Sequence, residues 1–212
     1  MRNFFSINVF LQFLLLISLG LILVLVIRGT TLNPEERLAL GINAYVNEEY
    51  DKAKHCFKDV IVSRQKDLVA IASFYLGNLS LKEKNGGRQA EMYFEQASVL
   101  GHAEASFKLA LLYDAGTKIP ENRSKAIALM TRAAKKQLPE AFYVLGVWAE
   151  RGYMGTVEPQ KIVALYEQAA QKGFLPAMTS LVALYAPGEV TASPERFAYW
   201  KKKLLEQKLL TQ

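Results

Sequence analysis

A spacing of 36 residues recurs along the chain and constrains its fold more than any other feature. Small apolar residues repeat at this interval, at Ala105, Ala141 and Ala177. Large apolar residues follow the same interval, at Leu109, Leu145 and Leu181, and a turn position does so at Gly101, Gln137 and Gly173. Repeats of this length are units that bury their apolar faces only by stacking on one another. The sequence therefore predicts a stack of similar units.

Each unit is predicted to be a hairpin of two helices. Between Glu104 and Tyr113 the large apolar residues fall at helical spacing, and Gly116 follows the segment. A second helical run covers residues 124–136 after a polar loop. Small residues such as Ala105 and Ala133 allow two helices to approach closely. The fold class is therefore all-α.

One unit carries a more specific pattern, which is Ala141, Leu145-Gly146, Gly152, Tyr166, Ala169-Ala170 and Gly173. This pattern resembles a Sel1-like repeat, a relative of the tetratricopeptide repeat with longer loops. Residues 103–137 and 175–205 resemble it more loosely, and the first hairpin, around Leu40-Gly41, resembles a tetratricopeptide repeat. The resemblance implies an α-solenoid of about five helical hairpins over residues 34–212, ending in an amphipathic capping helix.

The N-terminal residues are predicted to cross a membrane. Phe4 to Ile27 are 24 consecutive uncharged positions, and a helix rising about 1.5 Å per residue over that length covers the roughly 30 Å hydrocarbon layer. Val26 to Thr31 lack the small residues of a signal-peptide cleavage site. We therefore expect an uncleaved transmembrane anchor over residues 1–28 and a linker over 29–33, after which Asn33, Pro34 and Glu35 start a helix.

Charge does not decide on which side of the membrane the solenoid lies. Arg2 precedes the predicted span, and Arg28 and Arg37 follow it. We expect a single-pass protein of the bacterial inner membrane with a periplasmic solenoid, and the cytoplasmic side is the alternative. Asn8 and Gln12 lie four residues apart, on one face of the span, and are candidate contacts with a partner helix. Positions near the headgroups of a monomeric anchor are the alternative.

The sequence contains no recognisable pattern of catalytic or metal-binding residues. It has two histidines and one cysteine, and neither a phosphate-binding glycine loop nor a nucleophile elbow is present. His102 follows Gly101 in a predicted turn, where we expect a solvated side chain. The net charge of +6 does not predict nucleic-acid binding, because the Lys and Arg residues are scattered among Glu and Asp. The sequence favours a non-enzymatic protein without cofactor or metal.

Binding of a protein or peptide by shape remains as the candidate function. In a stack of helical hairpins the first helix of each unit lines the inner, concave surface. By their spacing from the Leu-Gly positions, the residues expected there are Phe74, Asn78, Lys82, Phe107, Leu111, Asp114, Tyr143, Val147 and Arg151. Phe74, Phe107 and Tyr143 would form an aromatic ladder of the kind found in binding hot spots. Packing of the same rings between neighbouring hairpins is the alternative.

These features favour a membrane-anchored scaffold that binds a protein or peptide partner. Sel1-like proteins are adaptors, so the resemblance implies a role in a bacterial envelope assembly such as secretion or polysaccharide machinery. The alternative is a permanent structural subunit of a membrane complex, held by its transmembrane and C-terminal helices. The basic helix from Phe197 to Leu209 is expected to cap the solenoid. Contact of its lysines with anionic lipid or an acidic partner is the other interpretation.

Overall fold

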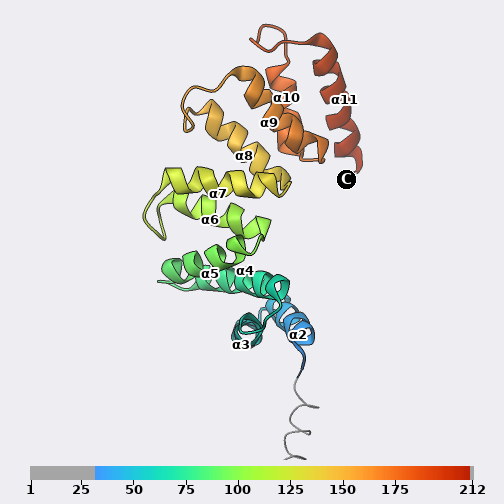
Figure 1. Ribbon diagram of the computed structural model, residues 1–212. Coiled ribbons are helices and arrows are strands. Elements are labelled where there is room, and N and C mark those ends of the chain that lie inside the picture. Colours follow the sequence, from blue (N-terminus) through green and yellow to red (C-terminus); the bar gives the residue numbers. More distant parts are fainter. Residues whose placement is uncertain (1–31, 211–212) are drawn as a thin grey trace, which may run out of the picture.

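The computed structural model describes residues 32–210, which form ten α-helices in five hairpins (Figure 1). The first helices of the hairpins are α2 (Pro34–Val46), α4 (Lys66–Lys82), α6 (Ala103–Ala115), α8 (Pro139–Glu150) and α10 (Leu175–Leu184). The second helices are α3 (Tyr50–Ile61), α5 (Gly87–Val99), α7 (Arg123–Lys135), α9 (Pro159–Gln171) and α11 (Pro194–Leu210). The predicted α-solenoid of about five hairpins is confirmed.

The hairpins stack in chain order. Each first helix packs on the second helix of its own hairpin, and each of α3, α5, α7 and α9 also packs on the first helix of the next hairpin. As a result α2 and α11 lie at opposite ends of the stack (Figure 1). Within residues 32–210, no helix combines the length and the hydropathy that a membrane crossing requires. The predicted span, with Asn8 and Gln12, lies outside the described residues.

The helix start predicted at Asn33 is present. The Asn33 Oδ1 atom accepts a hydrogen bond from the backbone N–H of Glu36 at 2.8 Å, and the Glu36 carboxylate accepts one from the backbone N–H of Asn33 at 3.0 Å. Pro34 occupies the first helical turn, where its missing N–H leaves no bond unmade. This reciprocal capping box fixes where the solenoid begins.

Glycines explain how the two helices of a hairpin come so close. In three hairpins a glycine of the first helix faces a buried aromatic ring of the second, and the pairs are Gly41 with Phe57, Gly77 with Phe94, and Gly146 with Tyr166. A Cβ atom on Gly77 would lie 2.5 Å from Cε1 of Phe94, which is closer than carbon atoms approach. In the third hairpin Ala110 follows the repeated leucine, and the unbranched Met130 stands 36 residues after Phe94.

The backbone conformation explains why a turn position recurs every 36 residues. Gly101, Gln137 and Gly173 lie in the turns between consecutive hairpins and have φ angles of 94°, 66° and 83°. This left-handed region favours glycine because it has no Cβ atom. Gln137 adopts it at a cost of about 1 kcal/mol or more. The turn geometry is therefore kept even where the residue type does not favour it.

His102 caps α6 and packs between hairpins. Its Nδ1 atom accepts a hydrogen bond from the backbone N–H of Ala105 at 3.3 Å, and its ring stacks on Phe74 with 4.5 Å between centroids. Burial lowers the pKa of His102, and the nearby carboxylate of Glu104 opposes this shift. The prediction of a solvated His102 is therefore wrong, because the turn places this side chain against α4.

The glycine contact yields a first prediction. Gly77→Ala should lower the free energy of unfolding by about 1–3 kcal/mol, because the new methyl group overpacks the ring of Phe94. Adding Phe94→Met should recover part of that loss, since the third hairpin combines Ala110 with Met130. Urea unfolding followed by circular dichroism measures both effects. Strictly additive effects of the two substitutions would contradict this account.

The cap at His102 yields a second prediction. Its folded-state pKa lies below that of the unfolded chain, which is about 6.5. The unfolded state therefore binds the proton first, so stability is lost as pH falls below about 6.5. His102→Asn keeps a good helix cap and does not titrate. Urea midpoints between pH 7.5 and 5.5 should fall more steeply for the natural chain than for this variant, and equal slopes would refute the assignment.

Candidate binding surface

The nine residues predicted to bind a partner all lie on first helices or at their C-terminal ends, and none is buried. Three are exposed, namely Lys82, Leu111 and Arg151. Six are half-buried, namely Phe74, Asn78, Phe107, Asp114, Tyr143 and Val147. We refer to these nine residues as the first-helix face. Their accessibility is compatible with binding, and their role in it stays a prediction.

The three aromatic residues of the first-helix face contact neighbouring hairpins. Phe74 stacks on His102, which begins the next hairpin, and the ring of Tyr143 lies 5.3 Å from that of Phe174 before α10. Phe107 packs against the buried cluster formed by the second, third and fourth hairpins. Each ring therefore stabilises the stack and exposes only part of its surface. This is the packing role that the sequence left as the alternative.

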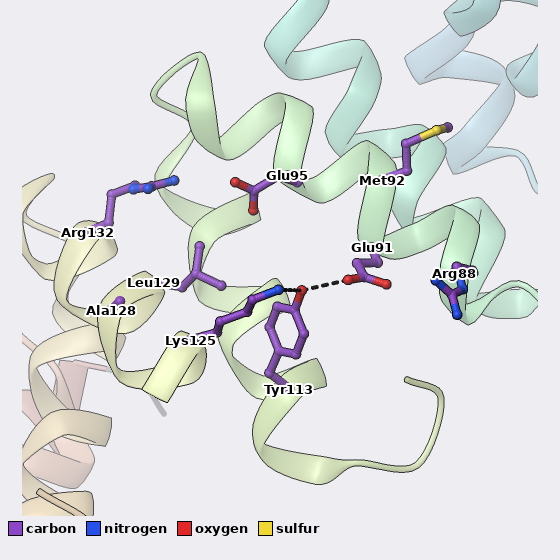
Figure 2. A pocket seen from close by; sticks show the side chains of 9 residues that line it. All are labelled: Arg88, Glu91, Met92, Glu95, Tyr113, Lys125, Ala128, Leu129 and Arg132. Atoms are coloured by element: carbon purple, nitrogen blue, oxygen red, sulfur yellow. Dashed lines mark hydrogen bonds between the residues drawn. The ribbon is translucent and has the colours of Figure 1, made fainter. Parts of the chain in front are cut away.

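The hollows of the surface lie elsewhere, between consecutive second helices. A hollow of about 580 Å³ lies between α5 and α7, and Figure 2 shows the side chains that line it. A second hollow of about 450 Å³ lies alongside the α5–α6 turn. Arg132 lines both of them. We refer to the two together as the α5–α7 groove. None of the nine residues of the first-helix face lines it.

Tyr113 forms the floor of this groove. It comes from the last turns of α6, and its hydroxyl lies between α5 and α7 (Figure 2). The Tyr113 Oη atom donates a hydrogen bond to Glu91 Oε1 at 2.6 Å and accepts one from Lys125 Nζ at 3.3 Å. Burial raises the pKa of Tyr113, and the bond to this hydroxyl raises the pKa of Lys125. Both groups therefore stay protonated near neutral pH, and the link between the two helices persists.

The same link recurs two periods later in the chain. Tyr185 stands 72 residues after Tyr113, and its Oη atom donates a hydrogen bond to Glu167 Oε1 of α9 at 2.9 Å. Arg196 of α11 forms an ion pair with Glu167 and donates a hydrogen bond to the Tyr185 hydroxyl at 3.4 Å. Hollows of about 410 and 440 Å³ adjoin this link. Position 149, between the two tyrosines, holds alanine.

Serines anchor the other end of the α5–α7 groove. The Arg132 Nη1 atom donates a hydrogen bond to Ser98 Oγ at 2.9 Å. Ser98 Oγ in turn shares a hydrogen bond of 2.7 Å with Ser106 Oγ, and both serines are 1% exposed. The guanidinium group of Arg132 is thus held from beneath while it lines the groove. Such fixed charges lose little conformational entropy when they bind a partner.

The groove has charged rims around an apolar strip. Glu91 and Glu95 line it on α5 together with Arg88, whereas Lys125 and Arg132 of α7 and Lys136 at its C-terminal end line the other side. Apolar residues of the same two helices also line it, namely Met92 of α5, which is 56% exposed, and Ala128 and the buried Leu129 of α7. Among the described residues 32–210, no group of three His, Cys, Asp or Glu side chains is arranged to hold a metal ion. The groove is suited to a polypeptide segment that carries charges of both signs.

Only part of this groove could have been predicted from the sequence. The series Tyr113, Ala149, Tyr185 was visible in the period, but the acidic partners Glu91 and Glu167 are 76 residues apart and do not follow it. Each link joins three helices, so its members share no common spacing. A recurring tyrosine in place of a small residue was the one detectable sign.

Comparison with solved structures assigns the fold to the Sel1-like repeat solenoids, although no family model matches the chain. A Sel1 repeat protein from Oxalobacter formigenes superposes on 81% of this chain and 68% of its own, with a TM-score of 0.67 and 24% identity. The protective antigen c5321 of uropathogenic Escherichia coli, which has this repeat fold, gives a TM-score of 0.69 at 20% identity, over 82% of this chain and 38% of its own. The structure of MamA protein gives a TM-score of 0.52 at 19% identity, over 83% of this chain and 92% of its own. These likenesses show the fold alone.

Part of the sequence is also similar to a curated yeast protein, matched in two strains. Protein SHC1 of Saccharomyces cerevisiae is 37% identical to this chain over 68 residues. The match covers 32% of this chain and only 13% of the yeast protein. The similarity is therefore limited to about two repeat units. It supports the repeat assignment and carries no activity of the whole yeast protein to this chain.

Proposed function

We propose that this chain is a non-catalytic scaffold that binds a segment of a partner protein in the α5–α7 groove. The observation that carries this proposal is the combination of apolar side chains with charges of both signs, since α5 carries Glu91 and Glu95 besides Arg88 and the α7 side carries only basic residues. Solenoids of helical hairpins present extended surfaces to other proteins. The groove is open to solvent along its side, whereas sites for small molecules enclose most of the ligand.

The charges of the groove would set the register and direction of the bound segment. Glu91 and Lys125 already share the hydroxyl of Tyr113, so their charges largely offset each other. Glu95 on one rim and Arg132 with Lys136 on the other lie farther along the groove. A partner segment would place a basic side chain beside Glu95 and an acidic one beside Arg132. An apolar side chain between them would contact the exposed Ala128. Such complementarity provides specificity more than raw affinity.

A photo-crosslinking experiment tests the groove. A benzoyl-phenylalanine at the exposed position of Met92 should form adducts with one defined protein in cells that express the full chain. The same probe at Leu111 tests the first-helix face, and at Val62, which is 82% exposed at the end of α3, it serves as the background control. Adducts from position 92 above those from position 62 support the groove.

Charge reversal in the same experiment provides the second arm. Glu95→Lys combined with Lys136→Glu reverses one charge on each side of the groove and should lower the adduct yield at position 92 by about tenfold, which corresponds to about 1.4 kcal/mol. Specific adducts only from position 111 would reject the groove in favour of the first-helix face. An adduct yield at position 92 that is unchanged by the charge reversal would also contradict the proposed mode of binding.

We propose further that residues 4–27 anchor the scaffold in a bacterial inner membrane, with the solenoid on the periplasmic side. The support is the run of 24 uncharged positions, which ends only a few residues before α2. A role in an envelope assembly such as secretion or polysaccharide machinery would follow from that location. Asn8 and Gln12 would then be available to a partner helix within the bilayer. A permanent membrane-complex subunit is the competing proposal for the same anchor.

Thiol labelling tests the location of the solenoid. Val190, in the loop before α11, is 85% exposed, whereas the single cysteine, Cys56, is buried. A Val190→Cys, Cys56→Ala chain should react with a membrane-impermeant maleimide in intact cells whose outer membrane has been opened. The Cys56→Ala chain alone is the control and should not react. Labelling of position 190 only after lysis would place the solenoid in the cytoplasm.

A further inference from the structure

The two ends of the solenoid leave a repeated packing contact incomplete. Leu76, Leu109, Leu145 and Leu181 occupy the same position of successive first helices and are at most 4% exposed. They lie in apolar clusters that include residues from the second helix of the preceding hairpin. Leu40 is the first member of this series, since it stands 36 residues before Leu76. It has no preceding hairpin among the described residues and is 37% exposed.

The opposite end lacks the complementary element. Each of α3, α5, α7 and α9 packs on a following first helix, whereas α11 is the second helix with which the described chain ends. Trp200 of α11 is buried in the cluster formed with α9 and α10. On other sides of the helix Leu205 is 56% exposed and Leu209 is 74% exposed, four residues apart. A terminal helix that only caps a solenoid would be polar there.

The charges of the two ends have opposite signs. Residues 32–51, which form α2 and the turn into α3, contain five acidic residues and one basic residue. Helix α11 contains five basic residues and two acidic ones. Among the basic residues, Lys201 precedes Leu205 by four residues and so lies on the same side of the helix. An apolar surface with opposite charges at the two ends of one molecule is complementary to another copy of itself.

We propose that α11 of one copy receives α2 of a second copy, so that the solenoid continues from chain to chain. The contact would repeat the packing of α9 on α10, with Leu40 of the incoming copy buried as Leu181 is buried within the chain. Because two different surfaces meet, the contact is heterologous and leads to open filaments or closed rings. An anionic bilayer would suit the lysines of α11 but would leave unexplained the exposed Leu40 at the acidic end.

Cysteine crosslinking of the full chain in detergent tests this contact, in a Cys56→Ala background. A chain carrying both Leu40→Cys and Leu205→Cys should give a ladder of crosslinked species with a short bis-maleimide. A chain with only one of these substitutions should stay monomeric. An equimolar mixture of the two single variants should give dimers and nothing larger. Each chain in that mixture carries one cysteine, so a crosslinked pair has no cysteine left for a third chain. Dimers of either single variant alone would mean an isologous contact and overturn the proposal.

Two further variants separate a specific contact from random collision. Leu209→Gln with Lys201→Glu, added to the double-cysteine chain, should lower the ladder about tenfold through the lost leucine contact and the reversed charge. Val62→Gln is the matched control, since Val62, directly after α3, is 82% exposed, and should leave the ladder unchanged. A ladder that is insensitive to the first variant overturns the proposal.

The remaining outcomes identify what else covers the two ends. If no ladder forms and position 40 resists a small maleimide, residues preceding α2 cover it, and the proposal fails. If no ladder forms and phosphatidylglycerol vesicles protect position 205 from the maleimide, the leucines of α11 contact lipid, and the proposal also fails. Free labelling of both positions in a monomeric chain rejects the contact as well.

Discussion

The structure depends on how closely the two helices of each hairpin approach each other. A glycine in the first helix lets an aromatic ring of the second helix lie directly against the backbone, as Phe94 does at Gly77. These rings are buried in the three hairpins that have this contact, so it fixes the distance between their two helices. The repeated leucine of the first helix then packs toward the preceding hairpin. The stack is the repetition of these two contacts.

The candidate binding groove is a consequence of this packing. The first helices and the aromatic residues on them fill the space between hairpins, and the consecutive second helices α5 and α7 leave a hollow between them. Tyr113 extends from α6 into that space, and its hydroxyl links Glu91 to Lys125. The polar groups at the floor of the groove are therefore hydrogen-bonded to one another. The link between Tyr185, Glu167 and Arg196 does the same at the next-but-one junction. The groove is therefore a feature of the junctions between hairpins and does not belong to any single repeat.

The repeat architecture also explains why the ends of the molecule differ from its middle. An internal hairpin buries its leucine and its second helix against neighbouring hairpins, whereas within residues 32–210 no hairpin precedes Leu40 and none follows α11. In a quasi-one-dimensional stack each interface contributes separately to stability, so an additional hairpin at either end would be stabilised by the same contacts. The proposed binding of a second copy uses this property, and it leaves the α5–α7 groove accessible because the two surfaces lie on different hairpins.

The sequence alone determined the all-α solenoid, because a 36-residue period is a local pattern that each hairpin repeats. It also determined the helix start at Asn33, since a cap involves neighbours in the chain. Tertiary structure decided what distant residues do together. His102, predicted to be solvated, packs against Phe74 in the structure. The hollows lie between second helices, away from Phe107 and the rest of the first-helix face. The physical reason is that a groove is defined by the space between elements, and that space depends on packing angles and on links that no fixed spacing encodes.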